Sequence, residues 1–209
     1  MTGALAAEPV LKEVLKDVRA HRRGAAFFIH LLLPHSSYVL DRDGGLLSPQ
    51  LWESAFSDVK GDGVLNTSGD RLRKYALYKG QVRWAHTKLY DFFNELRFLG
   101  IYEESTIILV GDHGSRIYFF DSRFKDMQEI PREDYEAAFS NFLAVKESGF
   151  SGGIVSDQVP ALLVIGKLLG TLPPEKWQDP ALFRVNFPQN KPFEYRPALM
   201  INMESNKSD

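Results

Sequence analysis

The sequence lacks cysteine, an excess of charge of either sign, and any long hydrophobic run. The absence of cysteine excludes a disulfide framework, a thiolate zinc site and a cysteine nucleophile, so a metal would need histidine and carboxylate ligands. Lys and Arg number 25 against 27 Asp and Glu, a formal net charge of −2. This balance gives no basic surface for nucleic acid or an anionic membrane, and we expect no nucleic-acid partner.

The longest apolar run, residues 25–34, is far shorter than the roughly 20 residues that span a bilayer. The N-terminal residues carry hydrophobic side chains at helical spacing among charges, which is typical of an amphipathic helix and not of a signal peptide. We therefore expect these residues to be soluble, with any membrane contact made only by an N-terminal part of a longer parent. Whether such a parent is exported or membrane-anchored stays open.

Hydrophobic periodicity predicts helices alternating with buried strands. Apolar residues at three- and four-residue intervals predict a helix over residues 9–22 and a longer one over residues 71–100. Continuous apolar runs predict strands over residues 27–33 and 105–110, buried on both faces as in a parallel sheet. We therefore expect an α/β fold in which a mostly parallel sheet is sandwiched by helices.

The remaining patterns are weaker. They predict a helix over residues 132–139, an edge strand over 142–145, a packed helix over 155–169 and a short helix near 49–56. Repeated prolines after residue 170 interrupt any long element, and residues 204–209 favour disorder. We therefore predict a main domain over residues 1–170 and an extended C-terminal segment over residues 171–209.

The residues with the clearest chemical potential follow the two predicted inner strands. Asp112 and His113 come directly after one strand, and His35 comes after the other. A carboxylate and a neutral imidazole side by side can both reach one divalent ion, and the flanking Gly111 and Gly114 let the backbone turn there. Because ligands gather at the carboxyl ends of parallel strands, we expect these side chains to share a pocket. The Asp-His-Gly tripeptide alone is more typical of an ordinary turn.

Three segments, taken in order, resemble the C-terminal half of enzymes of the sulfatase and alkaline-phosphatase superfamily. The first is the strand that ends in Pro-His-Ser-Ser-Tyr at residues 34–38. The second is the long helix with Tyr78, Val82 and Leu89, followed by a glycine turn and an acidic pair. The third is the apolar strand that ends in Gly-Asp-His-Gly at residues 111–114. The resemblance covers roughly residues 27–169 and implies a partial alkaline-phosphatase-like fold.

The resemblance also implies roles for individual residues. Asp112 and His113 would be metal ligands, and His35 would donate a hydrogen bond or a proton to a sulfate or phosphate ester. In this superfamily the metal activates a threonine, serine or formylglycine nucleophile and stabilises the developing oxyanion. Calcium, zinc and manganese all remain possible, since a mixed Asp/His site favours zinc or manganese and formylglycine sulfatases prefer calcium.

The sequence also departs from the family pattern. Residues 1–24 contain no strand followed by a nucleophile motif, no histidine follows His113, and Ser37 stands where sulfatases usually have a second proline. We therefore expect a C-terminal portion that lacks the nucleophile, paired with an N-terminal partner half or forming a homo-oligomer. The alternative is a catalytically inactive, truncated relative that acts as a binding or assembly module, with an exposed sheet edge.

Several other residues have a structural interpretation that competes with a functional one. We expect His30 and His86 to be structural, and Asp41 and Asp43 to form a turn rather than a calcium loop, because the required glutamate is missing. Either Arg116 or Lys125 could contact an anionic ester or simply be solvated. A nucleotide-binding domain of another family is disfavoured, because no glycine-rich phosphate loop follows a strand.

Overall fold

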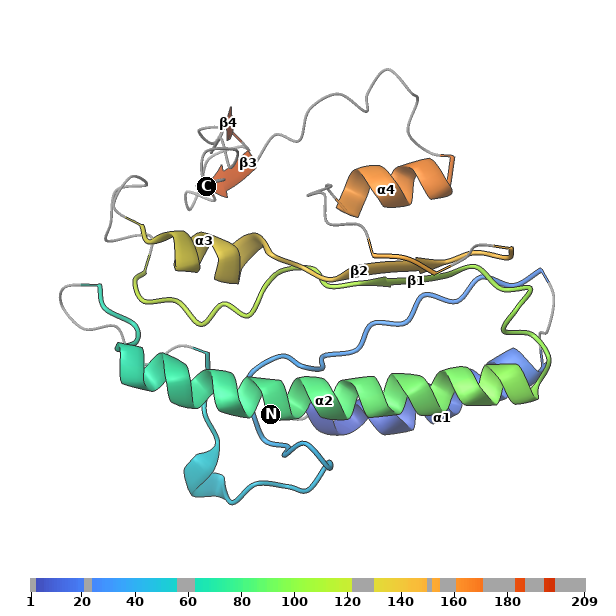
Figure 1. The fold of residues 1–209 in the computed structure, drawn as a ribbon, viewed down its shortest axis with the longest axis horizontal. Helices are drawn as coiled ribbons and strands as arrows, with labels where there is room; N and C mark the ends of the chain where they lie inside the picture. Colours follow the sequence, from blue (N-terminus) through green and yellow to red (C-terminus); the bar gives the residue numbers. More distant parts are fainter. Residues whose placement is uncertain are drawn as a thin grey trace. The chain divides into compact units, whose positions relative to one another are not determined.

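The computed structural model describes residues 3–20, 24–55, 63–121, 130–149, 152–154 and 161–170, together with the strand residues 183–186 and 194–197. The chain forms two compact units, Met1–Gly152 and Gly153–Asp209. The first unit contains, in order, α1 (Gly3–Ala20), η1 (Pro49–Leu51), α2 (Ser68–Phe98), β1 (Ile107–Val110), α3 (Arg132–Phe139) and β2 (Leu143–Lys146) (Figure 1). The second unit contains α4 (Ala161–Leu168) and an antiparallel pair, β3 (Phe183–Asn186) and β4 (Glu194–Pro197).

The long helix α2 is the central element of the first unit, and the prediction of a helix over residues 71–100 is confirmed. It begins with a capping box: the Thr67 hydroxyl accepts a hydrogen bond from the Asp70 amide at 3.2 Å, and the Asp70 carboxylate accepts one from the Thr67 amide at 3.0 Å. These bonds satisfy amide groups that a helix start leaves without partners. The helix ends just before Gly100, whose φ of +72° suits a residue without a Cβ atom.

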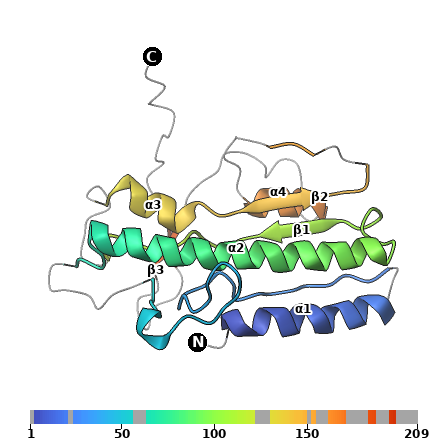
Figure 2. The same ribbon diagram turned by 60° about the horizontal axis from the view of Figure 1, so that its bottom comes forward.

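The helix α1 lies along the second half of α2 and runs in the same direction (Figure 1 and Figure 2). Leu11 and Val18 of α1 are buried together with Phe92 and Leu96 of α2, and Ile107 at the start of β1 packs against this cluster. Burial of such side chains contributes about 1.5–3 kcal/mol each. The predicted helix is therefore present over residues 9–20, although it begins earlier, with Pro9 inside it, and residues 21–22 lie outside the described residues.

The prediction of a mostly parallel sheet sandwiched by helices is wrong. Strand β1 pairs with β2 in antiparallel fashion, with Ile107 opposite Lys146 and Val110 opposite Leu143. Within the described residues, strands occur as two separate two-stranded sheets, and the regular elements of the first unit are mainly helical. An apolar run marks a buried extended segment, but it does not specify which segment pairs with it or in which direction.

Residues 27–33 illustrate this limit, because they are extended without being assigned to a strand. Their side chains alternate: Ile29 and Leu31 pack against the α1 and α2 cluster, whereas Phe28 is 95% exposed and His30 is also exposed. The predicted burial on both faces is therefore wrong, because Phe28 and His30 of this segment are exposed.

The weaker sequence predictions had mixed outcomes. The helix over residues 132–139 is confirmed as α3, and the edge strand appears one residue later than predicted, as β2. The predicted helix over 155–169 is represented by α4, and residues 155–160 lie outside the described residues. The predicted short helix near residues 49–56 is represented by η1, and residue 56 lies outside the described part. Residues 204–209, predicted to be disordered, also lie outside it. Among the described residues, no helix is both long and apolar enough to cross a membrane.

The loop after residue 40 is a turn, as the sequence predicts. The Asp41 carboxylate oxygen Oδ1 accepts hydrogen bonds from the amides of Asp43 at 2.9 Å and Gly45 at 2.7 Å. This carboxylate therefore organises its own loop, in the manner of an Asx turn.

Candidate functional site

The loop that carries His35 is held in place by a buried glutamine of α2. The Gln81 side chain is 0% exposed, and its amide nitrogen donates a hydrogen bond to the His35 carbonyl oxygen at 2.8 Å. Its amide oxygen accepts from the backbone amides of Val39 at 3.0 Å and Leu40 at 3.3 Å. One side chain thus fastens both ends of residues 35–40 to α2. Two peptide bonds near this histidine, Leu33–Pro34 and Ser36–Ser37, are cis.

The loop that carries Asp112 and His113 is held against α3. The Gly114 amide donates to the Ala138 carbonyl oxygen at 3.0 Å, and the Arg116 amide donates to the Ala137 carbonyl oxygen at 2.8 Å. A Cβ atom on Gly114 would lie 2.4 Å from that Ala137 oxygen, so only glycine allows the loop to approach the helix so closely. Position 114 is therefore fixed by backbone packing.

These two loops bring His35 and His113 together. Their imidazole rings have centroids 6.3 Å apart and meet edge to face, with an angle of 67° between the ring planes. Asp112 lies on the solvent side, with its side chain 80% exposed, and its Oδ2 is 3.4 Å from Nε2 of His113, whose side chain is 20% exposed. The three residues that the sequence singled out therefore share one location, and their chemical roles stay a prediction.

Both imidazoles use the same ring nitrogen to bind the backbone. Nδ1 of His113 lies 2.7 Å from the Gly114 carbonyl oxygen, and Nδ1 of His35 contacts the Ser36 carbonyl oxygen. Because a carbonyl oxygen can only accept, Nδ1 carries the proton in each bond, which leaves the lone pair of a neutral imidazole on Nε2. A histidine that binds a metal through Nε2 commonly has this second hydrogen bond.

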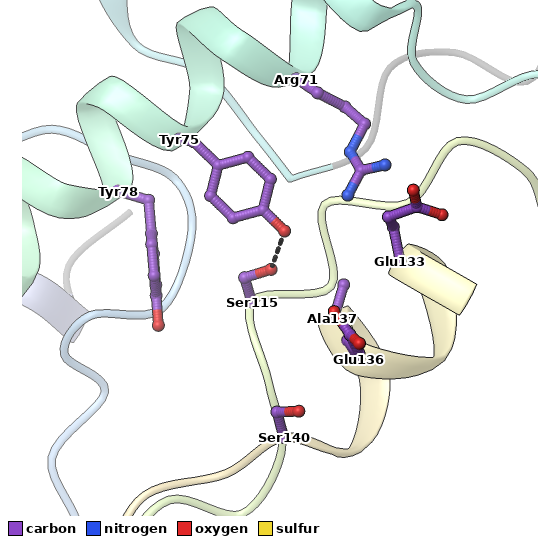
Figure 3. Close-up of a pocket in the computed structure, with 8 residues that line it drawn as sticks. All are labelled: Arg71, Tyr75, Tyr78, Ser115, Glu133, Glu136, Ala137 and Ser140. Carbon is purple, nitrogen blue, oxygen red and sulfur yellow. Dashed lines mark hydrogen bonds between the residues drawn. The ribbon is translucent and has the colours of Figure 1, made fainter. Parts of the chain in front are cut away.

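A group of tyrosines lies beside the two histidine loops. Tyr38 is 1% exposed, and its ring meets that of Tyr78 at 5.8 Å between centroids, while Tyr75 lies 6.3 Å from Tyr78. Burial raises the pKa of Tyr38 and of Tyr78, so both phenols stay protonated near neutral pH. The Tyr75 hydroxyl makes a 3.0 Å hydrogen bond with the Ser115 hydroxyl (Figure 3).

The other residues that the sequence raised lie elsewhere or are exposed. His30 is exposed on the extended segment, and His86 is exposed on α2. Arg116 is exposed and is the non-glycine residue with positive φ, +56°, among the described residues. Such backbone strain often accompanies functional loops. Lys125 lies outside the described residues.

The donor chemistry of these residues fits a divalent ion only in part. The carboxylate of Asp112 and Nε2 of His113 are suitable ligands, and His35 adds a second imidazole nearby. In the described part of the chain, however, no group of three or more His, Asp or Glu side chains has the geometry of a metal centre. Any ion at this position would therefore need further ligands.

Sequence reasoning missed the side chains that position the site, above all Gln81. The available signal was a polar residue between Tyr78 and Val82 in the apolar stripe of the long helix. A polar side chain at a packed helical position must find partners. Here those partners are backbone groups of the His35 loop.

No protein-family model, no curated protein and no solved structure matches this chain. The chemistry of the site is therefore inferred from its own side chains. They offer two imidazoles with available Nε2 atoms, one exposed carboxylate and a backbone fixed by two helices.

Proposed function

We propose that this chain carries part of the site of a metal-dependent, sulfatase-like hydrolase or phospho-group transferase that acts on sulfate or phosphate esters. The observation that carries the proposal is the 6.3 Å approach of the His35 and His113 rings, which lie far apart in the sequence. Because β1 and β2 are antiparallel, the expected parallel sheet gives the proposal no support. The proposal therefore depends on this local geometry and on the motif resemblance.

The proposed roles follow from the orientation of the side chains. Asp112 and Nε2 of His113 would hold the ion, which could be calcium, zinc or manganese. When bound, the ion would polarise an oxygen of the ester and stabilise its negative charge. His35 would face the ester and, in its imidazolium form, would give the proton on Nε2 to the leaving group, because Nδ1 is engaged with the backbone. No residue of this chain is assigned as the nucleophile.

Metal affinity tests the ligand assignment. Titration calorimetry with zinc, manganese and calcium chloride would be carried out on the whole chain and on the double variant Asp112→Ala with His113→Ala. We expect the double variant to bind at least about tenfold more weakly. His86→Ala removes an exposed histidine of α2 and is the matched control, which should bind like the unaltered chain. Equal affinity for the double variant and the unaltered chain would refute the metal assignment.

Ester binding tests the role of His35. Saturation-transfer NMR with 4-nitrophenyl sulfate and 4-nitrophenyl phosphate would be recorded with and without the preferred metal. We expect metal-dependent binding of one ester, weakened by His35→Ala while metal affinity stays within about threefold, because His35 faces the ester and not the ion. Binding that needs neither the metal nor His35 would contradict the proposal.

A binding or assembly module is the second candidate, and two observations favour it. The described residues do not complete a metal centre. Large apolar side chains are also exposed in the first unit, with Phe28 at 95% and Phe142 at 59%. Under this alternative, the chain would bind no ester in either metal condition, and light scattering would report self-association or capture by a partner half.

A further inference from the structure

A concavity lies between α2 and α3, next to the loop that carries His113. It has a volume of about 490 Å³, and its lining includes Arg71 and Tyr75 of α2, Ser115 of the loop, and Glu133 and Glu136 of α3 (Figure 3). None of these residues belongs to the proposed metal and ester site.

The most unusual group in this pocket is the Arg71 guanidinium, which Figure 3 shows directed toward α3. The side chain is 10% exposed, and its buried Nε has no hydrogen-bond partner among the described residues. Its flat faces are covered, since the Phe119 ring centroid lies 3.8 Å and the Tyr75 ring centroid 5.6 Å from Cζ. The Nε–H group on the edge of the guanidinium therefore remains a buried donor without an acceptor among the described residues.

The nearest carboxylate does not satisfy that edge. Oδ1 of Asp134 lies 3.8 Å from Nη1 of Arg71, which is too far for a hydrogen bond. Both Asp134 oxygens instead accept from backbone amides, that of Phe119 at 2.7 Å and that of Phe120 at 3.0 Å. Asp134 therefore balances the charge of Arg71 without filling its donors, and a buried guanidinium short of acceptors is costly.

A hydroxyl pair adds another donor to the same pocket. The Tyr75 and Ser115 hydroxyls share one hydrogen bond of 3.0 Å, whichever of the two donates. Since two hydroxyls carry two hydrogens, one hydrogen remains to be donated elsewhere. The hydroxyl pair therefore offers one further donor in the pocket that Arg71 also lines.

The acidic residues of α3 limit which ligand this pocket would accept. Glu136 is paired with Arg132 at 2.8 Å, so its charge is largely balanced. Glu133 contributes a carboxylate at the lining. A ligand must therefore bring acceptors to Arg71 and tolerate one nearby negative charge.

We propose that this pocket binds an oxyanion, namely a carboxylate, sulfate or phosphate group, through the edge of Arg71 and the hydroxyl pair of Tyr75 and Ser115. An oxyanion presents two oxygens that match the paired N–H groups of a guanidinium. The inference does not rest on the proposed hydrolase function, because it involves none of that site's residues. The anion is either free in solution or the acidic group of a larger molecule.

Binding would be measured by amide NMR of the whole chain, titrated with sodium phosphate, sulfate or succinate at constant ionic strength in the presence of EDTA. We expect saturable shifts of the Ser115 and Ile117 amides, because Ile117 donates to the Ser115 hydroxyl oxygen. A stronger response to succinate than to the inorganic ions identifies an organic acid as the ligand, and the reverse order identifies a free inorganic anion. Absence of saturable shifts with all three anions would overturn the proposal.

Variants separate this site from the rest of the surface. Arg71→Met should abolish the saturable shifts, whereas Arg83→Met, at an exposed position of the same helix, should leave them unchanged. Tyr75→Phe keeps the ring and should weaken binding about threefold to tenfold, so the proposal remains testable if Arg71→Met does not fold. Unchanged binding in Tyr75→Phe together with Ser115→Ala would place the anion elsewhere and contradict the proposal.

The effect of the Glu133 charge on oxyanion binding can be tested separately. Glu133→Gln removes the nearby negative charge and should tighten oxyanion binding, whereas unchanged or weaker oxyanion binding would contradict an anion bound beside Glu133. His35→Ala and His113→Ala should leave anion binding unchanged. Loss of binding in those two variants would mean that the anion occupies the metal and ester site, which would overturn this inference without refuting the proposed hydrolase function.

Discussion

Gln81 shows how one side chain determines the geometry of a whole loop. Its amide is fully buried and bonds to three backbone groups that otherwise have no regular secondary structure to pair with. Leaving such groups buried without partners costs about 1–3 kcal/mol each. The position of His35 relative to α2 therefore depends on a residue that takes no part in chemistry.

Replacement of Gln81 by methionine keeps the size of the side chain and removes its hydrogen bonds. We expect the free energy of unfolding to fall by about 2–4 kcal/mol, measured by urea denaturation. Gln50→Met, at an exposed position of η1, is the matched control and should be nearly neutral. An equal effect of both substitutions would mean that the bonds of Gln81 do not hold the loop.

Gly114 has the same importance for the His113 loop. An alanine there would place Cβ 2.4 Å from the Ala137 carbonyl oxygen, so the loop would have to move away from α3. We expect Gly114→Ala to destabilise the protein by about 1–3 kcal/mol and to broaden the His113 imidazole signal. Gly152→Ala, where a Cβ meets nothing within 4 Å, should leave stability unchanged. A neutral result for Gly114→Ala would show that the loop is not packed against the helix.

At the scale of elements, α2 shows which sequence signals predict a helix well. Its apolar stripe and its final glycine turn both mark a helix, and the capping box at Thr67 and Asp70 fixes where it begins. The strands were harder to predict, because pairing depends on segments that are distant in sequence. Strand β1 pairs with β2, and α3 lies between these two strands in the sequence. Residues 27–33 are extended, with Phe28 and His30 exposed.

The start of α2 should give the protein a specific pH dependence. Hydrogen bonds from Thr67, followed by one from Arg73, hold the pKa of Asp70 well below its usual value of 3.8. Because the folded-state pKa is lowered, the stabilisation is present above pH 3.8 and is lost as the pH falls below it. We expect the Tm difference between the unaltered chain and Asp70→Asn to be largest near neutral pH and to shrink below pH 3.8. A difference that does not change with pH would contradict this account.

At the scale of the whole molecule, the candidate site lies within the first unit, Met1–Gly152. The sequence could single out His35, Asp112 and His113 from their chemistry and from the positions that follow apolar runs. It predicted their approach from the ends of parallel strands, whereas the approach depends on Gln81 and on the contact of Gly114 with α3. The expected parallel sheet was wrong, yet the two loops still meet, because helices rather than neighbouring parallel strands position them.

Paramagnetic broadening by Mn²⁺ tests most directly whether His35 lies beside an ion that His113 binds. The effect falls steeply with distance from the ion, and the chain contains five histidines whose imidazole signals can be compared in one NMR spectrum. At substoichiometric Mn²⁺ we predict that the signals of His113 and His35 broaden together, before those of His30 and His86. Broadening of His113 without His35, or equal broadening of all five signals, would contradict this arrangement.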